Sequence, residues 1–205
     1  MLYKANPIYI ENTIKKQKGV AESILMKLKS LGFTAVVAGG APRDWFLGKI
    51  ASDLDFFVDN ASSCGKEFDV FDFCDQLDVE CKEIEPTGVY ELNKRLDSVV
   101  EFKFNNVSCQ IITLKSDQED DYVSSDQIHS TFPANVGKVS YKQNSNGDFV
   151  IEGTEEFYFA HKYKILDFEP SKLYNKYYKT KIRKKFKDYA LVLRRPSPKL
   201  HMSLS

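Results

Sequence analysis

Residues 35–59 of this 205-residue chain read AVVAGGAPRDWFLGKIASDLDFFVD, and this stretch decides how the rest of the sequence is interpreted. An apolar run ends in two adjacent glycines, Gly39 and Gly40. After a short intervening segment, a second apolar run carries Asp53 and Asp55. Because side chains alternate between the two faces of a strand, both carboxylates are expected on one face of a sheet. The stretch therefore predicts a glycine turn beside a pair of acidic side chains.

Two neighbouring carboxylates are suited to binding a divalent cation. Mg²⁺ prefers oxygen ligands and commonly binds one or two carboxylates together with substrate phosphates. Two such ions about 3.5–4 Å apart can activate an attacking hydroxyl and stabilise a leaving pyrophosphate. Gly39 and Gly40 have no side chains, so their backbone can approach a triphosphate, and Pro42 suits the start of a helix whose N-terminus favours anions. The residues thus predict nucleotidyl transfer from a nucleotide triphosphate, with Mg²⁺ or Mn²⁺ as cofactor.

The order and spacing of these residues resemble a known signature motif. It is the motif of class II tRNA nucleotidyltransferases (CCA-adding enzymes) and bacterial poly(A) polymerases, which belong to the DNA polymerase β-like nucleotidyltransferase superfamily. The resemblance implies an α+β fold with a mixed sheet flanked by helices, and the residues that follow predict a basic helical C-terminal region. It also implies site roles: Asp53 and Asp55 as catalytic metal ligands, and Gly39, Gly40, Arg43 and Asp44 as nucleotide-binding residues and their scaffold.

The third carboxylate that is common in this superfamily is replaced here. Two strands are expected over 98–104 and 107–113, joined by a turn at Asn105 and Asn106. The position where an acid is expected is Gln110, whose neutral amide is a poorer Mg²⁺ ligand than a carboxylate. Glu101 is the nearby carboxylate on a strand. We therefore expect Glu101 or Gln110 to complete the metal site.

The next motif of the family, Arg-Arg-Asp followed by Phe-Thr-x-Asn, is retained in part. Phe132 and Asn135 match it, whereas the Arg-Arg-Asp is absent. Asn135 is accordingly expected to bind nucleotide, and His129 is expected to be structural. The base-selecting motifs found later in CCA-adding enzymes are not recognisable.

Two functions follow from these matches and departures. The first is an active enzyme that transfers a nucleoside monophosphate from a nucleotide triphosphate to a hydroxyl, with an RNA 3′ end as the favoured acceptor. The second is a protein of the same fold that binds nucleotide or nucleic acid without turnover. The pair Asp53 and Asp55 favours the first, and Gln110 together with the missing Arg-Arg-Asp favours the second.

The net charge of zero hides an uneven distribution. Residues 162–199 contain 13 Lys or Arg against 3 acidic residues, so the rest of the chain is acidic. Tyrosines lie between these lysines and arginines. In nucleic-acid-binding segments such aromatic side chains stack on nucleobases, and the basic side chains contact phosphates. The apolar residues also recur at helical spacing, which is typical of a helix that packs on the domain and leaves its lysines solvated. If the segment binds RNA or tRNA, the expected contacts are Lys181, Arg183, Lys184, Lys185 and Lys187.

The composition, with 42% hydrophobic and 13% aromatic residues, fits a globular protein. No apolar stretch approaches the roughly 18 residues that cross a bilayer, and the N-terminus lacks the apolar core of a signal peptide. We therefore expect a cytoplasmic location and no membrane partner. The four cysteines lack the spacing of zinc ligands and are expected to be reduced core residues. The small size and the Lys, Asn and aromatic content resemble phage-encoded members of the superfamily.

The expected organisation is a nucleotidyltransferase-like domain over 1–160, a basic helical region over 161–195 and a flexible tail over 196–205. Helices are predicted over 13–31, 42–47 and 65–78, the last with Phe68, Phe71, Cys74 and Leu77 facing inward. Strands are predicted over 33–38, 54–58, 79–84, 98–104 and 107–114. A loop is expected over 116–127, followed by a hairpin around residues 144–147.

Overall fold

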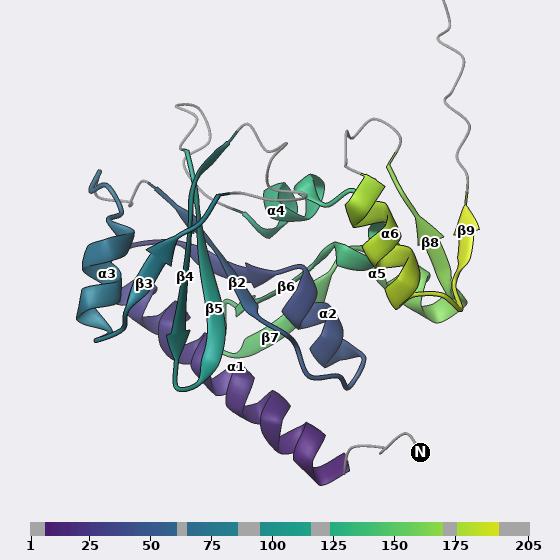
Figure 1. The fold of residues 1–205 in the computed structure, drawn as a ribbon, viewed down its shortest axis with the longest axis horizontal. Coiled ribbons are helices and arrows are strands. Elements are labelled where there is room, and N and C mark those ends of the chain that lie inside the picture. The colour runs from purple at the N-terminus through teal and green to yellow at the C-terminus, as the bar shows by residue number, and fades with distance from the viewer. Residues whose placement is uncertain (1–6, 61–64, 86–94, 116–123, 170–175, 193–205) are drawn as a thin grey trace, which may run out of the picture.

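The computed structural model of this chain describes residues 7–60, 65–85, 95–115, 124–169 and 176–192. Figure 1 shows the arrangement of its elements. The helices are α1 (Pro7–Ser30), α2 (Gly40–Phe46), α3 (Val70–Gln76), α4 (Ser125–Thr131), the 3₁₀ turn η2 (Asn135–Gly137), α5 (Glu155–Tyr163) and α6 (Lys176–Lys185). The strands are β1 (Ala35–Ala38), β2 (Leu54–Asp59), β3 (Cys81–Glu83), β4 (Leu96–Phe104), β5 (Val107–Leu114), β6 (Val139–Gln143), β7 (Phe149–Gly153), β8 (Ile165–Asp167) and β9 (Ala190–Val192).

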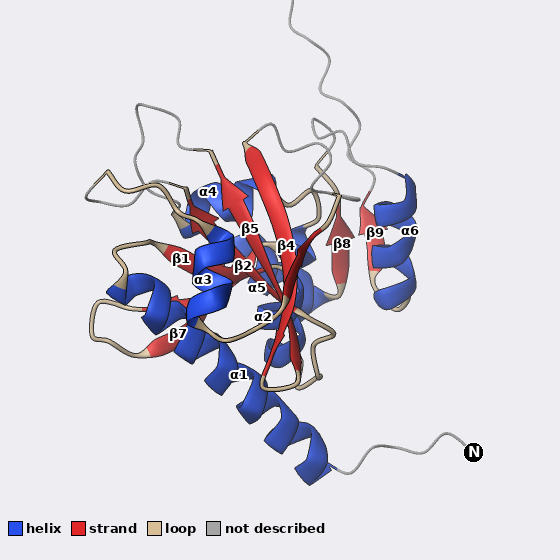
Figure 2. Cartoon of the chain, turned by 60° about the vertical axis from the view of Figure 1, so that its left-hand side comes forward, coloured by secondary structure: helices blue, strands red, loops and turns tan. Residues whose placement is uncertain are grey.

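Seven strands form one mixed sheet in the order β3-β4-β5-β2-β1-β6-β7. The neighbours β2 and β5 run parallel, and the other pairs in this sheet run antiparallel. A separate two-stranded parallel sheet pairs β8 with β9. Figure 2 shows the strands with helices on either side. The α+β fold with a mixed sheet flanked by helices is therefore confirmed.

The main sheet is covered by helices on both faces. Inward residues of α1, α2 and α3 pack on one face together with Leu54, Phe56 and Cys109. On the opposite face, Ile128 of α4 and Phe132 pack on Phe57 and its neighbours. Helix α4 contacts β1 and β6 on this face. Among the described residues, no helix is both long and apolar enough to cross a membrane.

Several predicted helix boundaries were wrong. Helix α1 begins at Pro7, six residues before the predicted start, because a proline is tolerated in the first helical turn. Helix α2 begins at Gly40, so Pro42 is its third residue. Helix α3 is shorter than predicted, because Asp69 caps it by accepting hydrogen bonds from the amides of Phe71 and Asp72. Its inward residues are Val70, Phe73 and Cys74, whereas Phe71 is exposed.

The strand predictions hold more closely than the helix predictions. Strand β5 has the predicted bounds, and the hairpin of β6 and β7 turns at residues 144–147 with mutual bonds between Asn144 and Asp148. Part of the predicted loop over 116–127 is instead the start of α4, where Ser124 and Gln127 form a capping box. Helix α5, capped by Thr154, and the strands β8 and β9 were not predicted.

The expected domain boundary between residues 160 and 161 falls inside α5. A third hydrophobic cluster joins the two sides of this boundary, with Val136 and Ala160 on one side and Leu166, Ile182 and Phe186 on the other. The C-terminal helix thus packs on the segment that contains η2. The tail expected over 196–205 lies outside the described residues.

Candidate active site

The two glycines at the end of β1 have different local environments. Gly39 has φ +78°, and a methyl group added there would lie 2.8 Å from Cζ of Phe132. Its amide donates to the carbonyl of Val139 at 2.9 Å, so this N–H is already used within the fold. The glycine at 39 is therefore explained by backbone conformation and by Phe132. Gly40 has more room, because a methyl group there would meet a nitrogen of Arg43 at 3.8 Å.

Asp53 and Asp55 lie where the chain enters β2. The segment that leads into β2 is held by the buried Gln17 of α1. The side-chain nitrogen of Gln17 donates to the carbonyl of Ala51 at 2.8 Å, and its side-chain oxygen accepts from the backbone N–H of Ala51 at 3.1 Å. Burial raises the pKa of the Cys109 thiol, and with the smaller contributions of the Asp55 and Asp53 charges included it is about 12. Both carboxylates are thus close enough to act on the same neighbouring side chain.

Strand register shows which residues accompany Asp55 on its face of the sheet. Gln110 of β5 is paired directly with Asp55, and Glu101 of β4 is paired with Gln110. Paired residues in adjacent strands point to the same face, and neighbouring strands are about 4.8 Å apart. Gln110 is therefore the immediate neighbour of Asp55, whereas Glu101 lies about 10 Å away by the same spacing. Continuing the register of β1 places Ala38 opposite Asp55 and Gly39 opposite Leu54, so the glycine turn lies on the other side of the carboxylate pair.

An open hollow of about 750 Å³ lies beside the carboxylates, over the starts of β2, β3 and β5 and the end of β4. Asp53, Glu101 and Gln110 are among its lining residues, together with Lys103 and Ser108. Lys103 and Ser108 were not among the predicted site residues. The period of two in their strands could have found them, because they share a face with Glu101 and Gln110.

Arg43 and Asp44 are both buried in α2, at 7% and 3% exposure. Arg43 Nε donates to Asp44 Oδ1 at 3.0 Å, and Lys185 Nζ of α6 donates to Asp44 Oδ2 at 2.6 Å. The Arg43 guanidinium also lies over the ring of Phe186, 5.5 Å from its centre. This pair therefore attaches the basic C-terminal helix to the helix that follows the glycine turn.

Asn135 is buried and its side chain is engaged with the backbone. Its amide nitrogen donates to the carbonyl of Ile165 at 3.1 Å, and its oxygen accepts from the amides of Val136 and Asp167. These bonds connect η2 to β8, so the structure assigns Asn135 a structural task. Its expected contact with nucleotide stays a prediction.

His129 lies buried in α4. Neither ring nitrogen has a hydrogen-bond partner within the described part of the chain, and burial lowers its pKa. The histidine is accordingly neutral at pH 7 and packs as part of the fold, in keeping with the expected structural role.

The predicted nucleic-acid contacts are divided between two environments. Lys185 is held by Asp44, and burial lowers its pKa, although the bond to Asp44 opposes that shift. The side chains of Lys181, Arg183, Lys184 and Lys187 are exposed, while Ile182 and Phe186 pack inward. Figure 1 shows α6 and β3 at opposite ends of the molecule, so the basic helix lies on the α2 side of the carboxylates and the hollow extends toward β3.

The donor set fits a hard cation in part. Asp53 and Asp55 supply two carboxylates, and the amide oxygen of Gln110 is the nearest additional oxygen ligand by register. Over the described ranges, no three His, Cys, Asp or Glu side chains are grouped closely enough to hold a metal. Glu101 thus does not join the pair in this arrangement, and any metal here would depend on substrate phosphate and water for its remaining ligands.

Solved structures with a similar fold are tRNA-processing enzymes. The CCA-adding enzyme of Thermotoga maritima complexed with tRNA has a TM-score of 0.58 and 13% identity, and the match covers 90% of this chain and 42% of that one. An apo tRNA-processing enzyme has a TM-score of 0.52 and 17% identity, covering 74% and 36%. A CCA-adding enzyme with CTP has a TM-score of 0.51 and 15% identity, covering 78% and 36%. No protein-family model and no curated protein matches the sequence.

These matches establish a nucleotidyltransferase-like fold. The chain spans 36–42% of the length of the three structures, so the similarity concerns one part of each enzyme.

Proposed function

We propose that the chain is a metal-dependent nucleotidyltransferase that transfers a nucleoside monophosphate from a nucleotide triphosphate to a hydroxyl. The observation that carries this proposal is the position of Asp53 and Asp55 at the start of β2, between the glycine turn and a polar hollow, in a fold shared with CCA-adding enzymes. The similar structures include complexes with tRNA and with CTP, which supports a nucleotide triphosphate and an RNA 3′ end as the two substrates.

In this proposal Asp53 and Asp55 hold Mg²⁺ or Mn²⁺, and Gln110 supplies a neutral oxygen beside them. A metal bound there would polarise the phosphate and favour the deprotonated form of the acceptor hydroxyl. The triphosphate lies on the β1 side. Gly40 is its main backbone contact, because the first amides of a helix have no acceptor within the helix and the amide of Gly39 is already bonded. The acceptor enters from the hollow over β4 and β5.

The alternative is a protein that binds nucleotide without turnover, and one observation favours it. The residue paired directly with Asp55 is Gln110, and the nearest acid beyond it is Glu101, one strand further away. A site with two carboxylates binds a dication more weakly than one with three.

The decisive experiment measures transfer and binding separately. The protein is incubated with each labelled nucleotide triphosphate, Mg²⁺ or Mn²⁺ and total RNA, and labelled RNA is quantified. Asp53→Asn with Asp55→Asn should abolish transfer and keep the melting temperature, whereas Asp148→Asn, a change of an exposed carboxylate in the β6–β7 turn, should retain both. Metal-dependent nucleotide binding without transfer to any acceptor would favour the alternative.

A second experiment tests RNA binding by α6. Reversing the charges of Lys181 and Lys184 should weaken RNA binding without changing nucleotide affinity. It should also make the dependence on salt less steep, by about 0.7 in the log–log slope for each RNA phosphate that the helix no longer neutralises. Reversing Lys15 and Lys16, which are exposed on α1, changes the net charge equally and serves as the control. Equal losses in both variants would mean that α6 is a solvated helix.

The cytoplasmic location and the phage source stay predictions.

A further inference from the structure

Two cysteines, Cys74 of α3 and Cys81 of the edge strand β3, lie on the same side of the sheet. Cys74 is fully buried on the inner side of α3, which packs on the sheet face that carries Phe102 and Cys109. Cys81 is paired with Phe102, so its side chain points to the same face and packs against the cluster that contains Cys74. The chain turns back sharply between the two cysteines, and the amide of Val79 donates to the carbonyl of Cys74 at 3.2 Å.

The thiol of Cys81 is close enough to that of Cys74 to affect its pKa. The pKa of Cys74 is raised to about 12. Burial is the largest cause, and a side-chain hydrogen bond with Cys81 is the next. Both are free thiols in the structure. Cys109 shares their sheet face, but Phe102 lies between it and Cys81 in the strand register, so Cys109 is two strands away at about 10 Å. Cys109 is therefore too far from Cys81 to form a disulfide bond with it.

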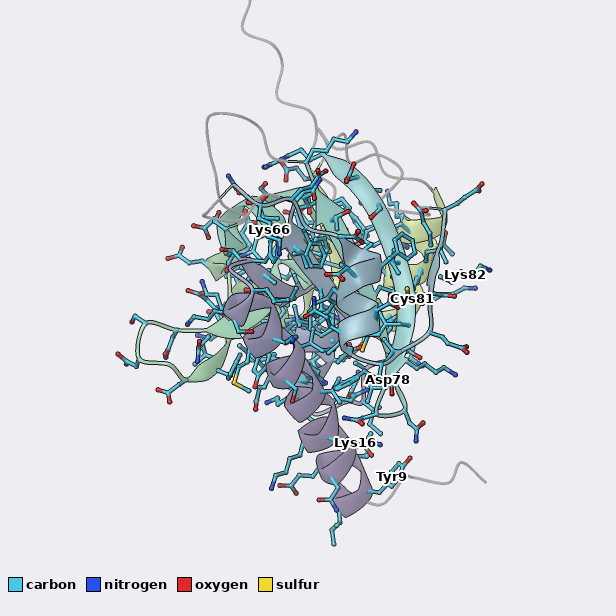
Figure 3. All side chains as sticks on the ribbon, turned by 90° about the vertical axis from the view of Figure 1, so that its left-hand side faces the viewer. Tyr9, Lys16, Lys66, Asp78, Cys81 and Lys82 are labelled. Atoms are coloured by element: carbon cyan, nitrogen blue, oxygen red, sulfur yellow. The ribbon has the colours of Figure 1, made fainter. Side chains whose placement is uncertain are left out.

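The two thiols also differ in access. Cys81 is partly exposed and is among the residues that line the hollow beside the candidate active site, whereas Cys74 has no exposed surface. Figure 3 shows Cys81 next to Asp78 and Lys82 on the side of the molecule formed by α3 and β3. An oxidant in solution can therefore reach Cys81 first.

We propose that Cys74 and Cys81 are an oxidisable dithiol, a modification site at which a peroxide forms a disulfide bond. Hydrogen peroxide oxidises the Cys81 thiol to a sulfenic acid and is reduced to water. The sulfur of Cys74 then attacks the sulfenic sulfur, the S–S bond forms, and the hydroxyl leaves as a second water with the proton from Cys74. Two thiols are thereby oxidised by one peroxide. The bond connects α3 to the strand that borders the hollow.

The test is mass spectrometry of the folded full-length protein after treatment with hydrogen peroxide and alkylation of the remaining thiols. Trypsin releases Cys74 and Cys81 together in the peptide 67–82, while Cys64 and Cys109 fall in different peptides. The expected product is the 67–82 peptide lacking two hydrogens and carrying no alkyl group. Cys81→Ser should leave Cys74 as a free thiol, and Cys64→Ser should not reduce the yield.

The bridge should also stabilise the fold, because it closes a short loop of the unfolded chain. We expect the melting temperature of the oxidised protein to rise by about 5 °C and to return on addition of a reductant. The oxidation of Cys64 shows that enough peroxide was added. If Cys64 is oxidised while both cysteines of the 67–82 peptide are still alkylated, the proposal is overturned. A disulfide between Cys81 and Cys64, seen as cross-linked peptides, would overturn it as well. Neither readout depends on nucleotidyl transfer.

Discussion

Replacing Gly39 with alanine tests the local structure of the candidate site. Its φ of +78° with ψ of −107° lies in a region that residues with a Cβ rarely adopt, and holding alanine there costs about 1–3 kcal/mol. The new methyl group would also lie 2.8 Å and 2.9 Å from two ring carbons of Phe132, and overpacking of this kind costs about 1–3 kcal/mol. Gly39→Ala should therefore lower the free energy of unfolding by about 4 kcal/mol and the melting temperature by about 10 °C.

Urea denaturation of a double-mutant cycle separates the two contributions. Phe132→Leu removes the two ring carbons that the methyl group would meet, so the double variant should recover at least about 1 kcal/mol relative to the sum of the single changes. Gly40→Ala is the matched control, because its added methyl group makes an ordinary contact and should change stability by less than about 1 kcal/mol. Strict additivity of the two changes, or equal losses at positions 39 and 40, would refute this reasoning.

Three further variants test the charges around the site. Asp44→Asn leaves the buried Arg43 without a balancing charge and should cost about 3 kcal/mol in urea denaturation, while an unchanged stability would mean that the pair is not held as described. Burial lowers the pKa of His161 from 6.5 to about 4, so the folded state binds its proton less readily than the unfolded state. Stability from this group is complete above pH 6.5 and should fall by about 3 kcal/mol between pH 6.5 and pH 4, a loss that His161→Phe should remove. Gln110→Asp places a third carboxylate beside Asp55 and should tighten Mg²⁺ binding about tenfold, seen as a larger thermal shift with Mg²⁺, and an unchanged shift would mean that position 110 does not face the metal.

The strands of this protein could be predicted from its sequence because their signals are local. The strand-like run in residues 107–114 and the turn at residues 144–147 each specify a structure from neighbouring residues alone, and both are present as predicted. The short helices could not be placed as well, since their ends depend on single caps such as Asp69 and Ser124. Phe71 was assigned to the wrong face of α3 because the predicted stripe was aligned on Phe68, which lies before the helix begins at Val70.

The sequence by itself determined that Asp53 and Asp55 share a strand entrance beside a glycine turn, because that follows from spacing and from the period of a strand. Tertiary structure decided which residues surround them. Strand order and register set Gln110 next to Asp55 and Glu101 one strand beyond. The contact of Gly39 with Phe132 and the bond of Asp44 to Lys185 also depend on tertiary structure. Each joins residues that are distant in sequence and meet only when the chain is packed.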